Sequence, residues 1–255
     1  MNNLEIKLLE HDVVRLIIRS GKGNPLTPQL LDELNEALDD LATKSPRALI
    51  LDSDGAKIFS GGFALPIIAD WSKNQIEAFL NRFSDILQKF LAFPAPSICV
   101  IEGHAIAGGF ILSLATDLRI VGSGKQMFGL SEVNLGAAVP AGAQVLLAAR
   151  TSSQHALRLS MTGRYIDPQQ AKEIGFADYV SENPLQDGID LATELAQKPS
   201  LGVNVTRQFR NAPIAKRILQ ADQAGMEDFL KSWFSPEAQQ GIKALAAKLS
   251  RKKNG

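Results

Sequence analysis

The sequence predicts a mixed α/β fold with a helical C-terminal region, and three observations lead to this prediction. Short apolar strands recur along the first half of the chain, and amphipathic segments with helical spacing lie between them. From about Ala143 onward, helical patterns dominate. A chain of 255 residues can form one large core with a smaller appendage. We therefore expect an α/β core over residues 1–195 and a helical region over residues 196–255.

The first strand–helix cycle spans about fifty residues. LEIKLLE and VVRLIIR flank His11-Asp12 and alternate well enough to predict a β-hairpin. Thr27 offers an N-cap and Pro28 a favoured first helical residue, and leucines follow at helical spacing as far as Leu41. The segment RALILDS then predicts a buried strand.

A second cycle follows the same order. Residues 74–93 predict a helix with one apolar face, which we interpret as facing the core. That face comprises Ile76, Phe79, Leu80, Phe83, Ile86, Leu87, Phe90 and Leu91. PSICVIEG predicts the next buried strand, and LRIVG and QMFGLSE complete the cycle after a glycine pair.

The remainder of the chain predicts mainly helices. Asp167-Pro168 and Ser235-Pro236 repeat the combination of cap and proline seen at Thr27. Helical spacing or composition predicts helices over residues 187–198, 201–211, 214–234 and 236–252.

Composition excludes several classes of protein. Lysine plus arginine and aspartate plus glutamate number 27 each, so no global field attracts nucleic acid or an anionic membrane. Cys99 is the single cysteine, which rules out a disulfide framework and suits a reducing compartment. We find no signal peptide and no apolar run long enough to span a membrane, so we expect a cytoplasmic protein. Three scattered histidines predict no metal site, and no glycine pattern for a nucleotide cofactor is present.

Two glycine-bearing turns carry the candidate chemistry. Residues 58–65, IFSGGFAL, follow the strand ALILDS, and residues 107–110, AGGF, follow SICVIEG. Bare backbone where a strand ends and a helix begins lets a ligand approach main-chain N–H groups. Two such turns facing each other could direct two donors at one oxygen, as in an oxyanion hole. The alternative is that the glycines serve tight turns or close packing.

These segments resemble the signatures of the crotonase (enoyl-CoA hydratase/isomerase) superfamily. KIFSGGFAL resembles the family's F-S-A-G-A-D-L, and EGHAIAGGFILSLATDLRI resembles N-G-x-A-x-G-G-G-x-x-L-A-x-x-x-D-x-R-I. FGLSEVNLG resembles F-x-x-P-E-x-x-x-G. MTGRYIDPQQAKEIGFADYV and SPEAQQGIKALAAKLSRK match later family segments, so the resemblance covers nearly the whole chain. It implies a crotonase-like spiral of repeated ββα units.

The resemblance also implies roles for individual residues. The N–H groups of Phe63 and Gly108 would form the oxyanion hole for an acyl-CoA thioester carbonyl. Phe63 replaces the family's usual alanine, which a main-chain donor tolerates but which reshapes the pocket wall. The acyl-CoA would bind along the backbone of Ser60, Gly61, Gly62, Phe63 and Ala64 and at Gly108. Coenzyme A would be part of the substrate, with no separate cofactor.

Acid–base residues distinguish the activities within the family. Hydratases use two glutamates, and the position of the first is occupied here by Ile111, which cannot exchange a proton. The second corresponds to Glu132. One carboxylate suffices to move a double bond, because the base takes a proton from C2 and returns it to C4. We expect an apolar pocket to raise the pKa of Glu132. The resemblance thus favours a Δ3,Δ2-enoyl-CoA isomerase.

Other positions receive structural or peripheral interpretations. His104 could be catalytic, but we interpret it as structural, as we do Asp117 and Arg119. The basic tail, formed by Lys243, Lys248, Arg251, Lys252 and Lys253, is either solvated or contacts the 3′-phosphate of CoA, across a subunit boundary if the chain assembles. The resemblance implies a homotrimer or a dimer of trimers, assembled through the C-terminal helices.

Alternative functions remain open at this point. Acyl-CoA decarboxylation also forms an enolate and does not require the first glutamate, and weak hydratase activity is a lesser variant. A non-catalytic acyl-CoA-binding or scaffold protein would also be compatible with Ile111 and Phe63. RNA binding is disfavoured by the zero net charge.

Overall fold

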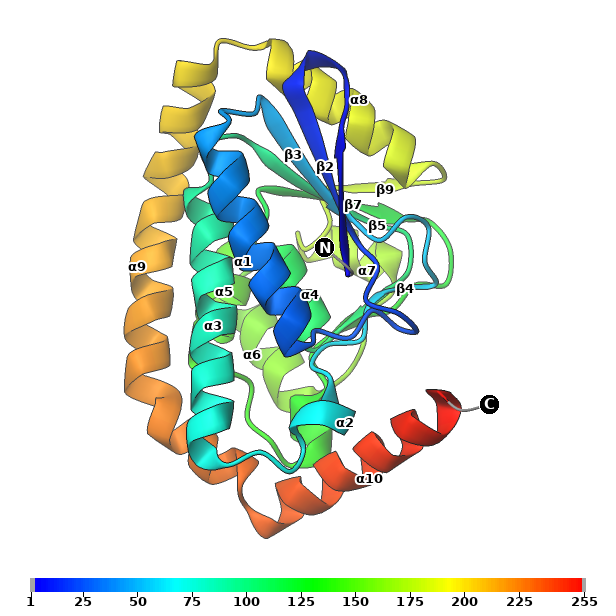
Figure 1. The fold of residues 1–255 in the computed structure, drawn as a ribbon, viewed down its shortest axis with the longest axis vertical. Coiled ribbons are helices and arrows are strands. Elements are labelled where there is room, and N and C mark those ends of the chain that lie inside the picture. Colours follow the sequence, from blue (N-terminus) through cyan, green and yellow to red (C-terminus); the bar gives the residue numbers. More distant parts are fainter. Residues whose placement is uncertain (1–2, 254–255) are drawn as a thin grey trace.

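The strands form two sheets in the computed structural model, which describes residues 3–253 (Figure 1). Within these residues, a six-stranded sheet has the order β1-β2-β3-β5-β7-β9, and a three-stranded sheet has the order β4-β6-β8. The strands are β1 Leu4–Leu8, β2 Val13–Ile18, β3 Ala48–Asp52, β4 Ile58–Ser60, β5 Ser97–Ile101, β6 His104–Ile106, β7 Leu118–Gly122, β8 Phe128–Gly129 and β9 Tyr179–Ser181.

Helices connect these strands and form the C-terminal part of the chain. The α-helices are α1 Pro28–Thr43, α2 Leu65–Ile68, α3 Lys73–Ala92, α4 Gly108–Leu114, α5 Ala141–Arg150, α6 Ser153–Thr162, α7 Pro168–Glu173, α8 Pro184–Gln197, α9 Ser200–Trp233 and α10 Pro236–Lys253. Two short 3-10 helices are η1 Glu10–Asp12 and η2 Glu132–Leu135.

The two sheets are built by a repeated unit. The strand pairs β3 and β4, β5 and β6, and β7 and β8 each give one strand to the large sheet and the next to the small sheet. Successive units pair in parallel in both sheets, whereas β1 and β2 form the predicted antiparallel hairpin. The predicted spiral of ββα units with a helical C-terminal region is confirmed.

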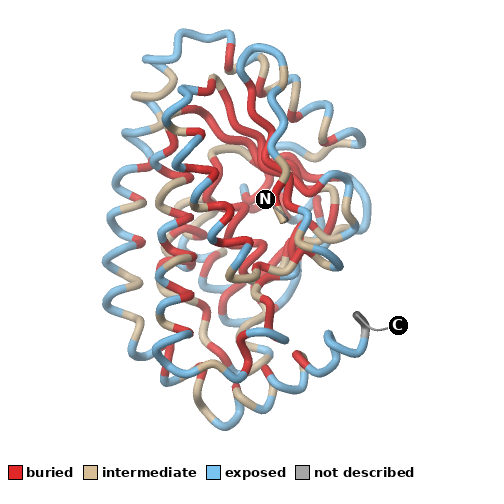
Figure 2. The backbone as a smooth tube through the Cα atoms, viewed as in Figure 1, coloured by how far each residue is buried: buried red, intermediate tan, exposed pale blue. Residues whose placement is uncertain are grey.

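Helices cover both faces of the large sheet, which explains the continuous apolar character of its inner strands. In β3, Leu49 and Leu51 face the main core, and Ala48 and Ile50 face a smaller core against α8. The main core also contains the apolar face predicted for α3, whose eight residues are all buried. Figure 2 shows this concentration of buried backbone in the sheet and the adjacent helices.

The sequence signals for helix ends act as predicted. Thr27 Oγ1 accepts a hydrogen bond from the Leu30 amide at 3.0 Å, and α1 begins at Pro28. Asp167 caps α7 in the same way, by accepting from the Gln170 amide at 2.8 Å. These caps fix where each helix leaves its preceding loop.

The C-terminal helices differ from the prediction in one respect. The segments predicted separately over residues 201–211 and 214–234 form the single helix α9, which continues through Pro213. Proline removes one intrahelical hydrogen bond, and Pro213 lies on the exposed side, where water can bind the freed carbonyl. Packing of α9 against α3 and α5 keeps it continuous. The predicted boundary at residue 195 falls inside α8, and the division of the chain there stays a prediction.

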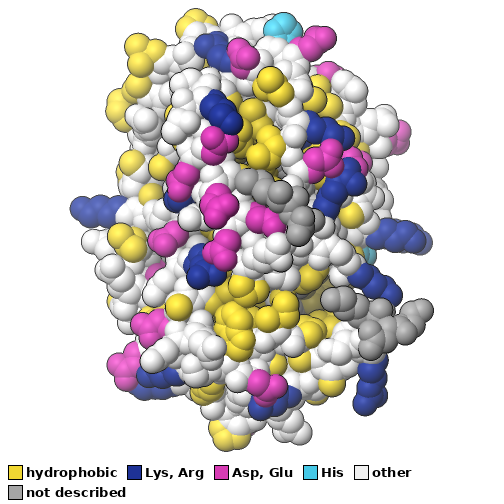
Figure 3. Space-filling view, in the orientation of Figure 1, with side chains coloured by type: hydrophobic (Ala, Val, Ile, Leu, Met, Phe, Trp, Pro, Cys, Tyr) yellow, Lys and Arg dark blue, Asp and Glu magenta, His cyan; other side chains and the backbone are white. Residues whose placement is uncertain are grey.

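Side chains of both charge signs lie on the face of the molecule that Figure 3 shows. Figure 3 shows acidic and basic side chains interspersed over the visible face, as the balanced composition leads one to expect. Among residues 3–253, no helix combines the length and apolarity needed to cross a bilayer.

Candidate active site

The two predicted glycine turns lie against each other at the ends of adjacent parallel strands. The first follows β4 and the second follows β6, and these strands pair in parallel. A Cβ atom added at Gly109 would lie 2.3 Å from the main-chain oxygen of Ser60, and one added at Gly62 would lie 2.9 Å from the amide nitrogen of Gly108. Real side chains do not fit at such distances, so the glycines permit the contact between the turns.

The two proposed donors are the main-chain amides left free by this arrangement. Within residues 3–253, no protein acceptor bonds to the amide of Phe63 or Gly108, whereas the neighbouring amides of Ala64 and Ala107 bond to carbonyls at 3.1 and 2.8 Å. The amide of Gly108 also begins α4, where the helix N-terminus adds positive potential. The structure therefore brings two turns with free donors together, as the oxyanion-hole hypothesis requires.

Ala107 holds the second turn in a conformation that favours glycine. Its φ of 51° and ψ of −125° lie outside the regions common for residues with a side chain. The family signature has glycine at this position, so the chain accepts backbone strain where the signature avoids it. Such strain persists where the surrounding structure fixes the turn, and here it sets the direction of the Gly108 amide.

Glu132 leaves the sheet at the same edge. Strand β8 pairs in parallel with β6, with Gly129 opposite Ile106, and parallel strands end at a common edge. Glu132 follows Gly129 by three residues, and Gly108 follows Ile106 by two. Both residues therefore lie just beyond the ends of adjacent parallel strands.

The carboxyl group of Glu132 is held in an unfavourable environment for its charge. Its Oε2 atom is buried and has no hydrogen-bond partner among residues 3–253. Burial raises the pKa of Glu132 from its ordinary value of 4.5 to about 7, although main-chain hydrogen bonds from Ser131 and Glu132 itself oppose the rise. A carboxyl group with this pKa can both accept and donate a proton near neutral pH.

Phe63 forms a wall beside the proposed hole. Its ring packs edge-on against Phe79 and Phe83, with ring centroids 5.0 and 5.2 Å away. The ring is also close to Gly108, because a Cβ atom at that glycine would lie 3.0 Å from two ring atoms. The ring and the bare Gly108 backbone therefore fit each other, and the Phe63 amide stays free.

A narrow pocket lies one helical turn beyond Gly108. Ile111 is buried at the position where the hydratase signature has a glutamate, and it lines this pocket. The space open within it is about 30 Å³. Helices α3, α5 and α9 supply the remaining walls, with Phe83, Met226 and Phe229 among the apolar side chains. Met226 and Phe229 were not singled out in the sequence, because only packing brings α9 to this place.

Some predicted substrate-binding groups serve the turn itself. Ser60 Oγ donates to the Asn24 carbonyl at 2.8 Å and accepts from the Gly62 amide at 3.2 Å. The Gly61 amide donates to the Gly23 carbonyl at 2.9 Å. These groups stabilise the loop, which leaves the amide of Phe63 as the free donor of the first turn.

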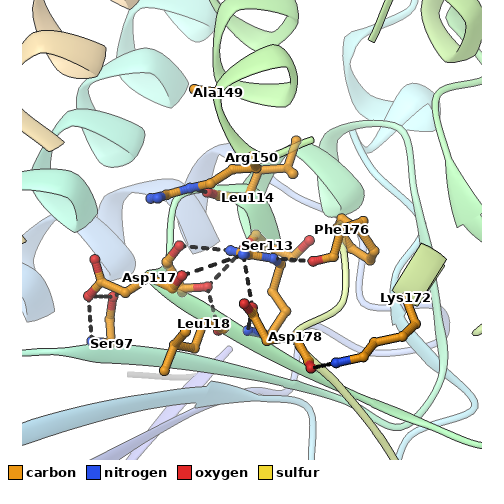
Figure 4. A network of polar contacts seen from close by, with 12 residues as sticks. Ser97, Ser113, Leu114, Asp117, Leu118, Ala149, Arg150, Lys172, Phe176 and Asp178 are labelled. Atoms are coloured by element: carbon orange, nitrogen blue, oxygen red, sulfur yellow. Dashed lines mark hydrogen bonds and ion pairs between the residues drawn. The ribbon is translucent and has the colours of Figure 1, made fainter. Parts of the chain in front are cut away.

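The residues interpreted as structural do form structural contacts. His104 Nδ1 accepts a hydrogen bond from the Met127 amide at 3.0 Å, which joins β6 to the segment before β8. Asp117 accepts a hydrogen bond from the Ser97 amide, and Arg119 donates to the Phe176 carbonyl; Figure 4 shows Ser97, Asp117 and Phe176 of this polar network. No cluster of side chains suited to a metal ion occurs among the described residues.

The basic tail is partly engaged in ion pairing. Lys243 Nζ lies 2.9 Å from Asp70 Oδ1, which links α10 to the loop after α2. The side chains of Lys252 and Lys253 lie outside the described residues. The predicted contact with the 3′-phosphate of CoA stays a prediction.

Comparisons with known proteins identify the family of this chain. Residues 12–253 match the enoyl-CoA hydratase/isomerase family, so the chain belongs to this family, that of the crotonase-fold enzymes acting on acyl-CoA thioesters. It is 30% identical over 233 residues to the mitochondrial methylglutaconyl-CoA hydratase of Mus musculus, covering 89% of this chain and 71% of the relative.

Solved structures show the same fold. The human mitochondrial delta3-delta2-enoyl-CoA isomerase superimposes with a TM-score of 0.91 at 21% identity, covering 98% of this chain and 99% of the other. An enoyl-CoA hydratase from Mycobacterium avium superimposes with a TM-score of 0.86 at 23% identity, covering 97% of each chain. Because the fold is shared by hydratases and isomerases, the choice between these reactions depends on the residues of the site.

Proposed function

We propose that this protein is a Δ3,Δ2-enoyl-CoA isomerase in which Glu132 is the sole acid–base. The observation that carries this proposal is the pairing of the buried Glu132 carboxyl, whose pKa is raised to about 7, with a buried Ile111 at the position where hydratases have their first glutamate. Coenzyme A is the part of the substrate that the protein binds. The reaction changes no redox state, so the proposal requires no redox cofactor.

The amides of Phe63 and Gly108 stabilise the charge that develops during the reaction. The Glu132 carboxylate removes a proton from C2 of the 3-enoyl thioester, and the electron pair moves into the thioester carbonyl. Two donors directed at the resulting oxyanion stabilise the dienolate. Protonated Glu132 then returns the proton to C4, which leaves the double bond between C2 and C3. Atoms and charges balance, and Glu132 ends in its starting state.

Ile111 disfavours the competing addition of water. Hydration requires one group to hold and deprotonate water while a second transfers a proton, and an isoleucine side chain does neither. The pocket behind Ile111 is narrow, and Ser84 and Asp222 line it together with apolar side chains. We also propose a cytoplasmic homotrimer or dimer of trimers.

Hydration is the second candidate, because the similar mouse protein is named a hydratase. The geometry gives it less support, since Glu132 would have to act alone on both water and substrate. Decarboxylation of an acyl-CoA and acyl-CoA binding without catalysis are the other functions that the substrate panel distinguishes.

A substrate panel with matched variants tests the proposal. Purified protein should convert a 3-enoyl-CoA to the conjugated 2-enoyl-CoA, followed by ultraviolet absorbance. Glu132→Gln should reduce this rate by about a hundredfold or more, the usual contribution of a general acid–base. Glu36→Gln, on the exposed surface of α1, should leave it unchanged.

Other results would contradict the proposal in distinct ways. Unchanged turnover in Glu132→Gln would remove Glu132 from the mechanism. Faster formation of 3-hydroxyacyl-CoA from a 2-enoyl-CoA would identify a hydratase, and carbon dioxide release from a malonyl-type thioester would identify a decarboxylase. Tight acyl-CoA binding without any turnover would identify a binding protein.

A further inference from the structure

A second pocket lies at the amino ends of β5 and β7, near the C-terminal end of α4, the helix whose first residue is Gly108. Its volume is about 350 Å³, within the range of small-molecule sites. The start of β7, the end of α5, the loop before β9 and the first half of α9 form its walls. The lining residues are Asp117, Arg119, Ala149, Arg150, Gly175, Asp178, Thr206, Arg207, Arg210 and Asn211.

Two of the four lining arginines are paired with the two aspartates. Arg207 Nε lies 2.6 Å from Asp117 Oδ2, and Arg119 Nη2 lies 3.0 Å from Asp178 Oδ2. Asp117 also accepts from the Ser97 amide at 2.8 Å, so its capacity to accept is largely used (Figure 4). The aspartates therefore compensate only part of the positive charge, and the lining carries a net charge of +2.

The other two arginines bond to main-chain oxygens. Arg150 Nε donates to the Leu114 carbonyl at 3.0 Å, and Arg210 Nη2 donates to the Ala149 carbonyl at 2.5 Å. Within residues 3–253, neither forms an ion pair with a carboxylate. The bonds hold both guanidinium groups at the pocket while some of their N–H donors stay unassigned.

Arg207 supplies a further unsatisfied donor. Its side chain is only 10% exposed, and its Nη2 atom is buried with no hydrogen-bond partner among the described residues. A buried charged donor without an acceptor is costly. Burial, together with the adjacent Arg119 and Arg210, also lowers the pKa of Arg150 to about 10. Both observations indicate that the pocket holds more positive charge than its own carboxylates neutralise.

We propose that this pocket binds a phosphate-type oxyanion, separately from the acyl thioester. Arg150 comes from α5, and Arg207 and Arg210 come from α9, so donors reach the pocket from two helices. A tetrahedral anion offers oxygens in several directions and can accept from three guanidinium groups, whereas a planar carboxylate offers two oxygens in one plane. A phosphate group carries a charge between about −1.5 and −2 at neutral pH, which is close in size to the positive charge of the lining.

Calorimetric titration with inorganic phosphate tests the site, with sodium chloride at equal ionic strength as the reference. The wild-type chain should bind one phosphate per subunit. Arg210→Gln should weaken binding by about tenfold or more, the effect of removing one charged hydrogen bond. Arg217→Gln removes the same charge from an exposed position on the same helix and should leave binding unchanged.

A second variant protects the test against a folding defect. Thr206→Glu places a carboxylate at an exposed position of the lining and removes no arginine, so it should also weaken phosphate binding. Equal heats with phosphate and chloride, or wild-type affinity in both pocket variants, would refute the proposal.

Two controls identify other sources of the signal. Saturating coenzyme A should leave phosphate binding intact, because the lining of this pocket includes none of the residues proposed to bind the acyl thioester. Loss of binding under these conditions would assign the heat to that site and overturn the proposal. A change in subunit assembly on Arg210→Gln, measured by light scattering, would show that the pocket is an interface between copies and would also overturn it.

Discussion

Glu132→Gln should be more stable than the wild-type protein at pH 8, although the substitution removes the proposed acid–base. Burial raises the pKa of Glu132 from 4.5 to about 7, so the folded chain holds one more proton than the unfolded chain between these pH values. The free energy of unfolding must therefore fall as the pH rises through this window. At about 1.4 kcal/mol for each pKa unit, the folded state loses about 3 kcal/mol by pH 8.

The substitution removes this dependence because glutamine does not titrate. Urea unfolding of both proteins at pH 5 and pH 8 can be followed by the fluorescence of the buried Trp233. The stability of Glu132→Gln relative to the wild type should rise by about 2–3 kcal/mol between the two pH values. All other titrating groups are present in both proteins, so their contributions cancel in the difference between the two unfolding free energies. The exposed Glu36→Gln should show no such rise, and parallel pH profiles for wild type and Glu132→Gln would refute the inferred desolvation of Glu132.

Three further predictions, each with its own substitutions, concern the packing and the chemistry of the site. Gly109→Ala should destabilise the fold by about 1–3 kcal/mol in thermal unfolding, because its Cβ would lie 2.3 Å from the Ser60 carbonyl oxygen. The matched control is Gly202→Ala in α9, where the added Cβ would meet nothing within 4 Å, and it should stabilise the fold by about 0.5–1 kcal/mol. Equal effects of Gly109→Ala and Gly202→Ala would contradict the close contact between the turns. Ile111→Glu should introduce hydration of 2-enoyl-CoA, measured as 3-hydroxyacyl-CoA, whereas a glutamine there should not; activity in both variants would exclude a role for the new carboxyl. Phe63→Ala should raise kcat/KM for C2-branched relative to linear thioesters by removing the ring and keeping the amide, and an unchanged ratio would show that the ring does not select substrates.

The local elements and the identity of the proposed site residues were predictable from the sequence. Thr27-Pro28 set the start of α1, and the apolar spacing of residues 76–91 set the buried face of α3. The three signatures indicated Phe63, Gly108 and Glu132, because a main-chain donor and a carboxylate at fixed spacing leave a recognisable pattern. Helix capping and apolar periodicity depend on residues a few positions apart, so each segment can be predicted from its own sequence.

Tertiary structure alone decided which segments meet and how charge is compensated there. Parallel pairing of β4, β6 and β8 brings residues 62, 108 and 132 to one edge, and burial then raises the pKa of Glu132. Packing of α9 across α5 gathers Arg150, Arg207 and Arg210, which are separated by up to sixty residues and share no motif. The sequence determined the residue types and the local geometry, whereas desolvation and charge compensation depend on neighbours distant in the chain, which only the folded structure places.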